Sequence, residues 1–188
     1  MKRIKGKDNL NTIEEWNVYY GCVDRSELKA NRFYIYKGIL KFLKKKECSL
    51  LEIGCGEGFG LDLISQNFPN FKLTGYDFSP TAIELAKKNF NHINFKVHDI
   101  LKDKIENVYD YIICLETLEH LEKPNFVIDK CLQKCKKFIL SCPYREYMKK
   151  DSLHIITDIT LKSFNKYAIL ESGFLDKKII QIVLKGRV

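Results

Sequence analysis

The sequence predicts an α/β fold, with a doubly wound, mostly parallel six- or seven-stranded sheet that has helices on both faces. Short apolar runs of strand length recur from residue 49 onward, and segments with apolar residues at helical spacing lie between them. Near-continuous apolar runs are typical of parallel strands that are buried on both faces. The expected strands are 49–53, 71–76, 93–97, 109–115 and 137–142, and the expected helices between them are 58–67, 80–91 and 123–135.

The flanking segments complete the expected order of elements. Two helices are expected before the core, near 10–20 and at 25–46. After the fifth strand we expect a loop at 143–157, a helix at about 159–172 that Gly173 ends, and a last strand within 174–185. Neither a repeat nor a Pro/Gly-rich linker interrupts the chain. We therefore expect one domain over 1–188, with an N-terminal helical lid segment at 1–47 and an α/β core at 48–188.

Composition narrows the class of protein. A chain of 188 residues with 45% hydrophobic content is long enough for one well-packed core. It has neither an apolar stretch of about 18 residues nor an apolar segment behind its charged N-terminus, so we expect a cytoplasmic protein with no membrane partner. The seven cysteines are odd in number and never spaced as CxxC, which predicts buried reduced thiols rather than disulfides or a cysteine zinc site.

The formal net charge of +8 comes largely from Lys-rich stretches at 42–47, 132–137 and 147–151. A basic balance favours a polyanionic partner or an acidic small substrate, so RNA stays open as a partner. No aromatic residues alternate with the lysines as single-strand binding requires, and charge alone is weak support for nucleic acid. The oligomeric state is not predicted.

The strongest local pattern is LLEIGCGEGFG at 50–60, directly after the first expected strand of the core. Its glycines let the backbone turn sharply and approach a ligand, and the helix that follows points free N–H groups into the same space. A dinucleotide fingerprint needs G-x-G-x-x-G, but the sixth position from Gly54 is Phe59 and from Gly56 it is Leu61. A P-loop is excluded because no Gly-Lys-Ser/Thr follows.

Acidic residues stand at the ends of three expected strands. Glu52 leads into the glycine loop, Asp77 ends the second strand nineteen residues after Gly58, and Asp99 follows the third strand. Asp77 is placed to accept hydrogen bonds from a ribose diol, and Asp99 lies at the carboxyl edge where open α/β sheets bind ligands.

In this order the motifs resemble those of the class I S-adenosylmethionine-dependent methyltransferases, over roughly residues 48–175. The matching segments are LLEIGCGEGFG, GYDFSP, VHDI, YDYIICLETLEHL and SCP. The resemblance implies the class I methyltransferase fold and the cofactor S-adenosyl-L-methionine. A cationic sulfonium without phosphate also suits acids around a glycine loop better than a lysine-bearing phosphate cradle.

The resemblance also implies a cofactor-binding role for particular residues. The glycine loop would lie under the methionine portion, with Glu52 near its ammonium, while Asp77 would bind the ribose and Asp99 the adenine. The implied cofactor-binding set is Glu52, Gly54, Cys55, Gly56, Gly58, Asp77, Phe78, Asp99, Ile100 and Leu115. Family members close the sheet with two further strands, but only about fifteen residues follow Gly173, which leaves that last strand pair open.

The stretch LETLEHLEKP, after the fourth strand of the core, raises the question of how a methyl acceptor is activated. On a helix, Glu116, Glu119 and His120 would share one face, and His154 reaches the same edge from the loop after the next strand. These four residues are the candidate catalytic set, and they are also a plausible O/N ligand set for Mg²⁺, Mn²⁺, Fe²⁺ or Zn²⁺. A solvated helix start and a general base are the alternatives. Tyr144, Arg145 and Glu146 are further candidates at this edge.

Two methyltransferase groups show a similar pattern. Small-RNA 3′-terminal 2′-O-methyltransferases carry Glu-x-x-Glu-His, a later His, and a Pro-x-x-Glu-Tyr stretch that Pro143, Glu146 and Tyr147 resemble. Quinone-pathway O-methyltransferases carry a similar Glu-x-x-Glu-His. Upstream, NTIEEWNVYYG with Trp16, Tyr19 and Tyr20 is expected either to cover the cofactor as a lid or to pack on the sheet.

The expected function is methyl transfer to a hydroxyl or amine of a small-molecule acceptor. A metal-dependent RNA 3′-terminal 2′-O-methyltransferase is the first alternative. A non-catalytic cofactor-binding subunit that serves a partner, suggested by the short C-terminal strand region, is the second.

Overall fold

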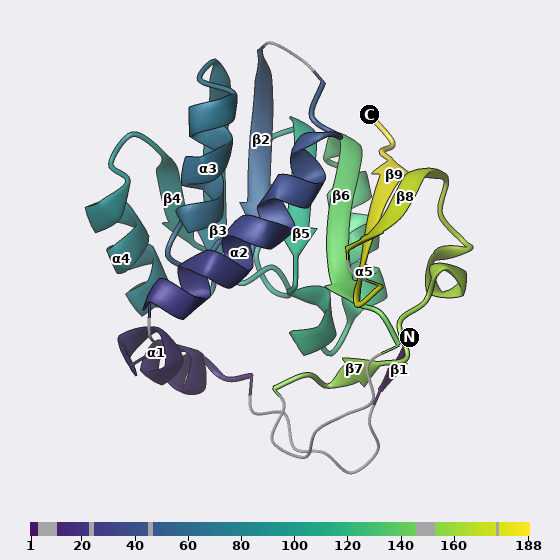
Figure 1. Ribbon diagram of the computed structural model, residues 1–188, viewed down its shortest axis with the longest axis horizontal. Helices are drawn as coiled ribbons and strands as arrows, with labels where there is room; N and C mark the ends of the chain where they lie inside the picture. The colour runs from purple at the N-terminus through teal and green to yellow at the C-terminus, as the bar shows by residue number, and fades with distance from the viewer. Residues whose placement is uncertain (4–10, 23–24, 45–46, 146–152, 176) are drawn as a thin grey trace.

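The computed structural model describes residues 1–3, 11–22, 25–44, 47–145, 153–175 and 177–188. Seven strands form one sheet in the order β4-β3-β2-β5-β6-β9-β8, and two short strands, β1 and β7, pair separately. Figure 1 shows the sheet with helices against it. The strands of the large sheet are β2 (Cys48–Ile53), β3 (Phe71–Asp77), β4 (Asn94–Val97), β5 (Tyr109–Leu115), β6 (Cys135–Pro143), β8 (Ile169–Leu175) and β9 (Ile179–Lys185).

The directions and order of the strands predict a ligand-binding crevice beside β2. Strands β4, β3, β2, β5 and β6 pair in parallel, and only β9 runs against its neighbours β6 and β8. The order reverses at β2, which has β3 on one side and β5 on the other. Such a switch point opens a crevice outside the carboxyl ends of the strands, so β2, β3 and β5 are the strands expected to carry the site.

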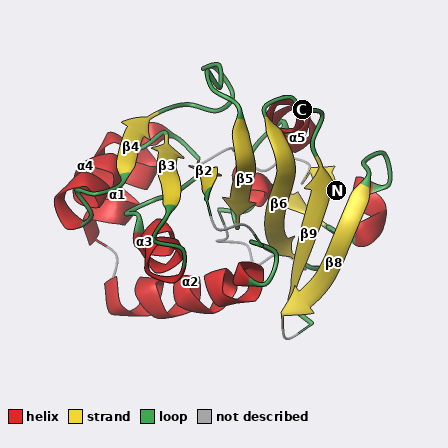
Figure 2. Cartoon of the chain, turned by 90° about the horizontal axis from the view of Figure 1, so that it is seen from above, coloured by secondary structure: helices red, strands yellow, loops and turns green. Residues whose placement is uncertain are grey.

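Helices cover both faces of the sheet, as Figure 2 shows from above. Residues of α2, α3 and α4 join one buried apolar cluster with one set of strand residues. Residues of α5 join a second cluster on the opposite face, together with Ile155, Ile156 and Phe164 from the C-terminal third of the chain. The α-helices in the described residues are α1 (Ile13–Cys22), α2 (Arg25–Leu40), α3 (Phe59–Asn67), α4 (Pro80–Asn89) and α5 (Pro124–Leu132). The predicted doubly wound, mostly parallel sheet is confirmed, with seven strands.

The C-terminal segment corrects two predictions. The helix predicted at about 159–172 is wrong: only a 3₁₀ turn, η2 (Leu161–Phe164), forms there, with Thr160 and Ser163 capping it reciprocally. Gly173 does not end a helix but lies inside β8, opposite Gln181 of β9. The pair β8 and β9, which the sequence left open, therefore completes the sheet. The predicted loop at 143–157 ends in β7 (Ile156–Thr157), which pairs with β1 (Lys2–Arg3).

The helix predicted at 25–46 ends earlier than expected. Helix α2 stops at Leu40, and the turn after it directs Phe42 and Leu43 into the core. Of the helices in the described part of the chain, none is both long and apolar enough to cross a membrane.

Candidate functional site

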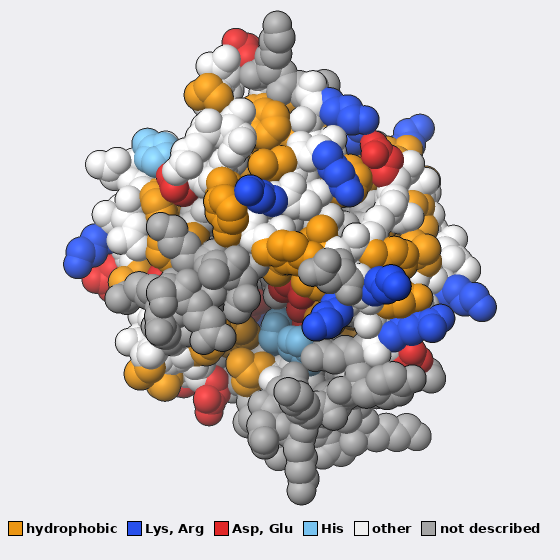
Figure 3. Space-filling model, in the orientation of Figure 1, with side chains coloured by type: hydrophobic (Ala, Val, Ile, Leu, Met, Phe, Trp, Pro, Cys, Tyr) orange, Lys and Arg blue, Asp and Glu red, His pale blue; other side chains and the backbone are white. Residues whose placement is uncertain are grey.

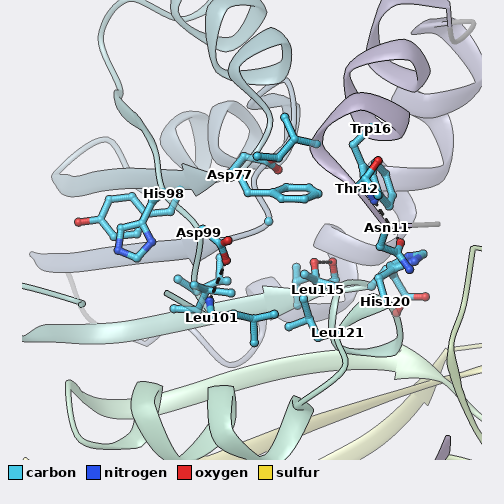
Figure 4. A pocket seen from close by; sticks show the side chains of 18 of the residues that line it. Asn11, Thr12, Trp16, Asp77, His98, Asp99, Leu101, Leu115, His120 and Leu121 are labelled. Carbon is cyan, nitrogen blue, oxygen red and sulfur yellow. Dashed lines mark hydrogen bonds between the residues drawn. The ribbon is translucent and has the colours of Figure 1, made fainter. Parts of the chain in front are cut away.

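A cavity of about 430 Å³ opens at the carboxyl ends of β2, β3 and β5. Its walls come from these strand ends, from the loops that follow them, and from α1 and the residues just before it. Figure 4 shows the cavity from close by, and in Figure 3 acidic and histidine side chains lie together in a hollow near the centre of the displayed face. The site is therefore at the edge that the strand order predicts.

The glycine loop approaches the cavity at Gly54. This residue has φ +77, and a β-carbon there would collide with the side chain of Thr117, which follows β5. The N–H groups of Gly54 and Cys55 donate to the carbonyl of Tyr76, over 2.8 and 3.1 Å, which ties the loop to the end of β3. The backbone at Gly54 therefore lies closer to Thr117 than a residue with a β-carbon would permit.

Asp77 lies between the glycine loop and the start of α4. Its Oδ2 accepts the N–H of Gly56 at 2.9 Å and its Oδ1 accepts the N–H of Ser79 at 3.0 Å. These two bonds fix the carboxylate at the cavity wall, where it is only 5% exposed. Carboxylate oxygens at this position provide the acceptors that a ribose diol requires.

Asp99 lines the cavity beyond the end of β4. Its Oδ1 accepts the N–H of Leu101 at 3.0 Å, and its Oδ2 lies 2.9 Å from the ammonium of Lys102. The ion pair raises the pKa of the exposed Lys102. Three apolar residues of the predicted cofactor set, Phe78, Ile100 and Leu115, also line the cavity.

Four residues of that set lie outside the cavity lining: Glu52, Cys55, Gly56 and Gly58. Glu52 is fully buried on β2, and the hydroxyl of Tyr36 on α2 donates a hydrogen bond to its Oε1. Tyr36 itself lines the cavity and passes over Gly60, where a β-carbon would meet its ring. Sequence reasoning missed Tyr36, because nothing in α2 distinguishes it from a core aromatic.

The chain turns sharply where β5 ends. Glu116 has φ +49, a left-handed conformation that strains a non-glycine residue. Its N–H donates to the carbonyl of Ser141 at 3.1 Å, and the Ser141 hydroxyl donates to its Oε1 at 2.7 Å. Two bonds from β6 thus hold Glu116 in this conformation at the cavity wall.

The expectation that Glu116, Glu119 and His120 share a helix face is wrong. Only a 3₁₀ turn, η1 (Leu118–His120), forms, and Glu116 precedes it. His120 lines the cavity, whereas Glu119 is buried beneath it and 1% exposed.

Three of the four predicted metal ligands come together. Glu119, His120 and His154 each offer a ligand atom, and these atoms lie within 4.8 Å of one another. The rings of His120 and His154 meet edge to face, with centroids 4.7 Å apart. Within the described residues this group does not include Glu116, which is held by Ser141.

The other candidates of the edge lie apart from this group. The ring of Tyr144 packs against Phe174, and Arg145 lies over the ring of Tyr144. Glu146 and Tyr147 fall outside the described residues.

The helix α1 lies beyond the strand ends and contacts α4, as Figure 1 shows. The ring of Trp16 lies edge-on to His120, with centroids 5.1 Å apart, and 6.5 Å from that of Phe78. Asn17 Oδ1 accepts the hydroxyl of Ser79 at 2.6 Å, which joins α1 to the start of α4. Trp16 and Tyr20 of this helix line the cavity.

Comparison with known proteins agrees with this geometry. The family described as "Methyltransferase domain" matches residues 51–137. A malonyl-[acyl-carrier protein] O-methyltransferase of Priestia megaterium is 34% identical over 93 residues, which is 48% of this chain and 34% of that protein. Residues 51–137 are thus similar in sequence to a methyltransferase domain. The chain spans about a third of the length of the curated relatives it matches.

Solved structures show the same fold. A chain from the complex between the Haloferax volcanii Trm112 methyltransferase activator and a methyltransferase superposes with a TM-score of 0.80 at 12% identity, over 92% of this chain and 97% of that one. The plantazolicin methyltransferase BpumL, in complex with SAH, superposes with a TM-score of 0.67 at 19% identity, over 93% of this chain and 98% of that one.

The cavity suits S-adenosylmethionine, the cofactor that the sequence motifs imply. Gly54 brings the backbone to the cavity wall, and the carboxylates of Asp77 and Asp99 provide acceptors for hydroxyl and amino groups.

Proposed function

We propose that this protein is an S-adenosylmethionine-dependent methyltransferase that transfers a methyl group to a hydroxyl or amine of a small-molecule acceptor. The observation that carries the proposal is the continuity of one cavity, which is lined by Asp77 and Asp99 on one side and by Glu116 and His120 on another. Cofactor-binding acids and an acceptor-activating group therefore share one enclosed space, as an in-line displacement requires.

In the proposed mechanism the chain binds, orients and deprotonates. When bound, S-adenosylmethionine supplies an electrophilic methyl group on a sulfonium. Asp77 would accept the ribose hydroxyls, Asp99 would accept from the adenine amino group, and Gly54 would let the backbone approach the methionyl portion. These contacts would hold the cofactor against the acceptor and provide the proximity on which methyl transfer depends.

His120 would receive the acceptor proton. The proposal gives this role to His120 rather than Glu119 because His120 lines the cavity and Glu119 does not. An imidazole also has an unperturbed pKa near 6.5, which suits a general base at neutral pH. Trp16, Tyr20 and the rest of α1 would act as a lid that excludes water from the cavity.

Two measurements test the proposal. Calorimetric titration with S-adenosylhomocysteine should show affinity that falls by about tenfold or more in Asp77→Ala, because each lost charge-assisted hydrogen bond contributes about 1.5–3 kcal/mol. Asp110→Asn, at the opposite edge of the sheet, is the matched control and should bind as the unsubstituted protein does. Equal affinity in Asp77→Ala would remove the cofactor assignment.

The second measurement is S-adenosylhomocysteine release with a panel of hydroxyl and amine acceptors. His120→Ala should lower kcat by about 10²–10⁴-fold, the range expected for a general base, while S-adenosylhomocysteine affinity changes by less than about threefold. An unchanged kcat would show that His120 does not carry the proton.

A second candidate function is metal-dependent 2′-O-methylation of a 3′-terminal ribose of RNA. The convergence of Glu119, His120 and His154 within 4.8 Å favours it, because two imidazoles and a carboxylate suit Mn²⁺, Fe²⁺ or Zn²⁺. Calorimetry with Mn²⁺ is the direct test: binding that disappears in His154→Ala, together with chelator-sensitive activity on RNA 3′ ends, would support it. Undiminished activity in chelator would exclude it.

The reason for considering a non-catalytic subunit no longer holds. It was suggested by a short C-terminal strand region, but β8 and β9 complete the sheet. The fold is similar to that of a chain solved in complex with the Trm112 activator. Dependence on an activator of this kind can be tested by co-expression, which should raise activity or yield if the chain needs one.

A further inference from the structure

The carbonyl of Leu153 accepts hydrogen bonds from two side chains that are far apart in sequence. The amide Nδ2 of Asn11, just before α1, lies 2.9 Å from it. The imidazole Nδ1 of His120, in η1 after β5, lies 3.3 Å from it. Leu153 itself immediately precedes His154, so one carbonyl joins the lid segment to both histidines of the site.

The orientation of Asn11 is fixed by a second bond. Trp16 Nε1 donates to Asn11 Oδ1 at 3.1 Å, which leaves the NH₂ group to face the carbonyl of Leu153. The ring of Trp16 then lies edge-on to His120, at an interplanar angle of 89°. Figure 4 shows Asn11 and Trp16 beside His120 at one end of the cavity.

The same loop is held elsewhere by the start of the chain. Strand β1 pairs antiparallel with β7, with Lys2 opposite Thr157 and Arg3 opposite Ile156. In addition, the N–H of Ile155 donates to the carbonyl of Glu119 at 2.9 Å, so the loop is also tied to η1. The N-terminal segment therefore contacts the His154 loop on both sides of His154, at Leu153 and at β7.

A carbonyl oxygen can only accept, so its bond with His120 requires a proton on Nδ1 and places the lone pair on Nε2. This is the tautomer that acts on an acceptor as a base, and it is equally the one that would bind a metal through Nε2. Either role of His120 thus depends on the position of the Leu153 carbonyl, to which Asn11 also donates a hydrogen bond.

We propose that Asn11 is a positioning residue for His120: by holding the Leu153 carbonyl, it fixes the Nδ1–H tautomer and the ring orientation of His120 when α1 covers the cavity. The inference rests on the proposed function for the role of His120, but its structural part does not. In this proposal, Asn11 links enclosure of the cofactor by α1 to activation of the acceptor. Partners that orient a working histidine in this way typically change activity by about 10–100-fold when they are removed.

The test uses Asn11→Asp and Asn11→Ala. Asn11→Asp is nearly isosteric and keeps an oxygen for Trp16, but it replaces the donor to Leu153 by a second acceptor, so it isolates the bond in question. Asn17→Ala, on α1, is the matched control, because Asn17 accepts the hydroxyl of Ser79 at the start of α4.

The first readout is the ¹⁵N spectrum of the histidine rings, recorded at about pH 8 with S-adenosylhomocysteine bound. The chain has four histidines, and His120→Gln assigns the relevant signals. His120 should show the Nδ1–H pattern in the unsubstituted protein and in Asn17→Ala, and a shift toward mixed tautomers in both Asn11 variants. An unshifted His120 in Asn11→Asp would overturn the inference, whether or not an acceptor is known.

The second readout is kinetic. With an acceptor in hand, Asn11→Asp should lower kcat by about tenfold while S-adenosylhomocysteine affinity stays within about threefold. A loss confined to cofactor affinity, with kcat unchanged, would show that Asn11 only tethers the lid. A failure of the proposed function is recognised separately, because it would leave every variant and the unsubstituted protein inactive while the tautomer shift persisted.

Discussion

The hydroxyl of Tyr36 on α2 donates a hydrogen bond to the carboxylate of Glu52, the fully buried acid at the end of β2. The contact joins a helix that precedes the α/β core to the strand that leads into the glycine loop. The Tyr36 ring also forms part of the cavity wall, with Gly60 leaving room for it. One residue thus connects the buried support of the loop with the ligand site.

Tyr36→Phe should lower the free energy of unfolding by about 1.5–3 kcal/mol, because a buried carboxylate loses a charge-assisted donor. Chemical denaturation of Tyr36→Phe, Glu52→Gln and the double variant forms a thermodynamic cycle that isolates the pair. Coupling of more than about 0.5 kcal/mol is expected for residues in contact. Strictly additive effects would mean that the two residues contribute independently.

Gly54→Ala should abolish measurable cofactor binding. Its left-handed backbone would cost an alanine about 1–2 kcal/mol, and the new methyl group would collide with Thr117. Titration with S-adenosylhomocysteine checks this, with thermal unfolding recorded alongside. Gly173→Ala is the control: its β-carbon would meet only the end of the Lys41 side chain, at 3.6 Å. Full binding by Gly54→Ala would show that the loop rearranges.

The sequence predicted the inner strands well because of where they lie. Most residues of β2, β3 and β5 are buried, so each strand contains an apolar run that marks it, and each begins within two residues of its predicted start. Strand β8 lies at the sheet edge, alternates between exposed and half-buried residues and contains Gly173, so its pattern was indistinguishable from a helix that ends at glycine. Pairing with β9, a tertiary effect, decides its conformation.

The site residues show the same contrast between what the local sequence predicts and what tertiary packing decides. Gly54, Asp77 and Asp99 lie at or just after the ends of strands, so topology alone places them at the cavity. Asn11 and Tyr36 reach it from segments outside the core, and only the packing of α1 and α2 brings them there. The backbone conformation of Glu116 was equally hidden, because it depends on bonds to Ser141 of another strand.

One thiol of seven should react rapidly with a disulfide reagent in the folded protein. Cys22 is exposed and the other six are buried, and all seven lie in the described part of the chain. Burial raises the pKa of Cys114, Cys131 and Cys142 well above the ordinary value, so little thiolate forms. Spectrophotometric titration should show the fast phase disappear in Cys22→Ser, and denaturant should release all seven thiols. Two or more fast thiols in the folded protein would contradict the buried positions.

Asp110 should make stability depend on acid pH. It lies at the start of β5, where its Oδ2 accepts the N–H of Ser49 on β2 and its Oδ1 accepts from Lys136 on β6. Partial burial alone would raise the pKa of Asp110, but the hydrogen bonds from Ser49 and Lys136 outweigh it and lower the pKa to about 2. Since the folded pKa is depressed, its contribution is fully present above about pH 4 and is lost as the pH falls toward about 2.

Asp110→Asn should therefore be less stable than the unsubstituted protein at pH 7, by about 1 kcal/mol once solvent screening of the exposed Lys136 is allowed for. The gap should close as the pH approaches about 2, because the aspartate is then protonated and resembles asparagine. Urea unfolding of both proteins between these pH values measures the difference directly, and acid effects on other carboxylates cancel. A gap that stays constant across this range would show that the carboxylate charge contributes nothing.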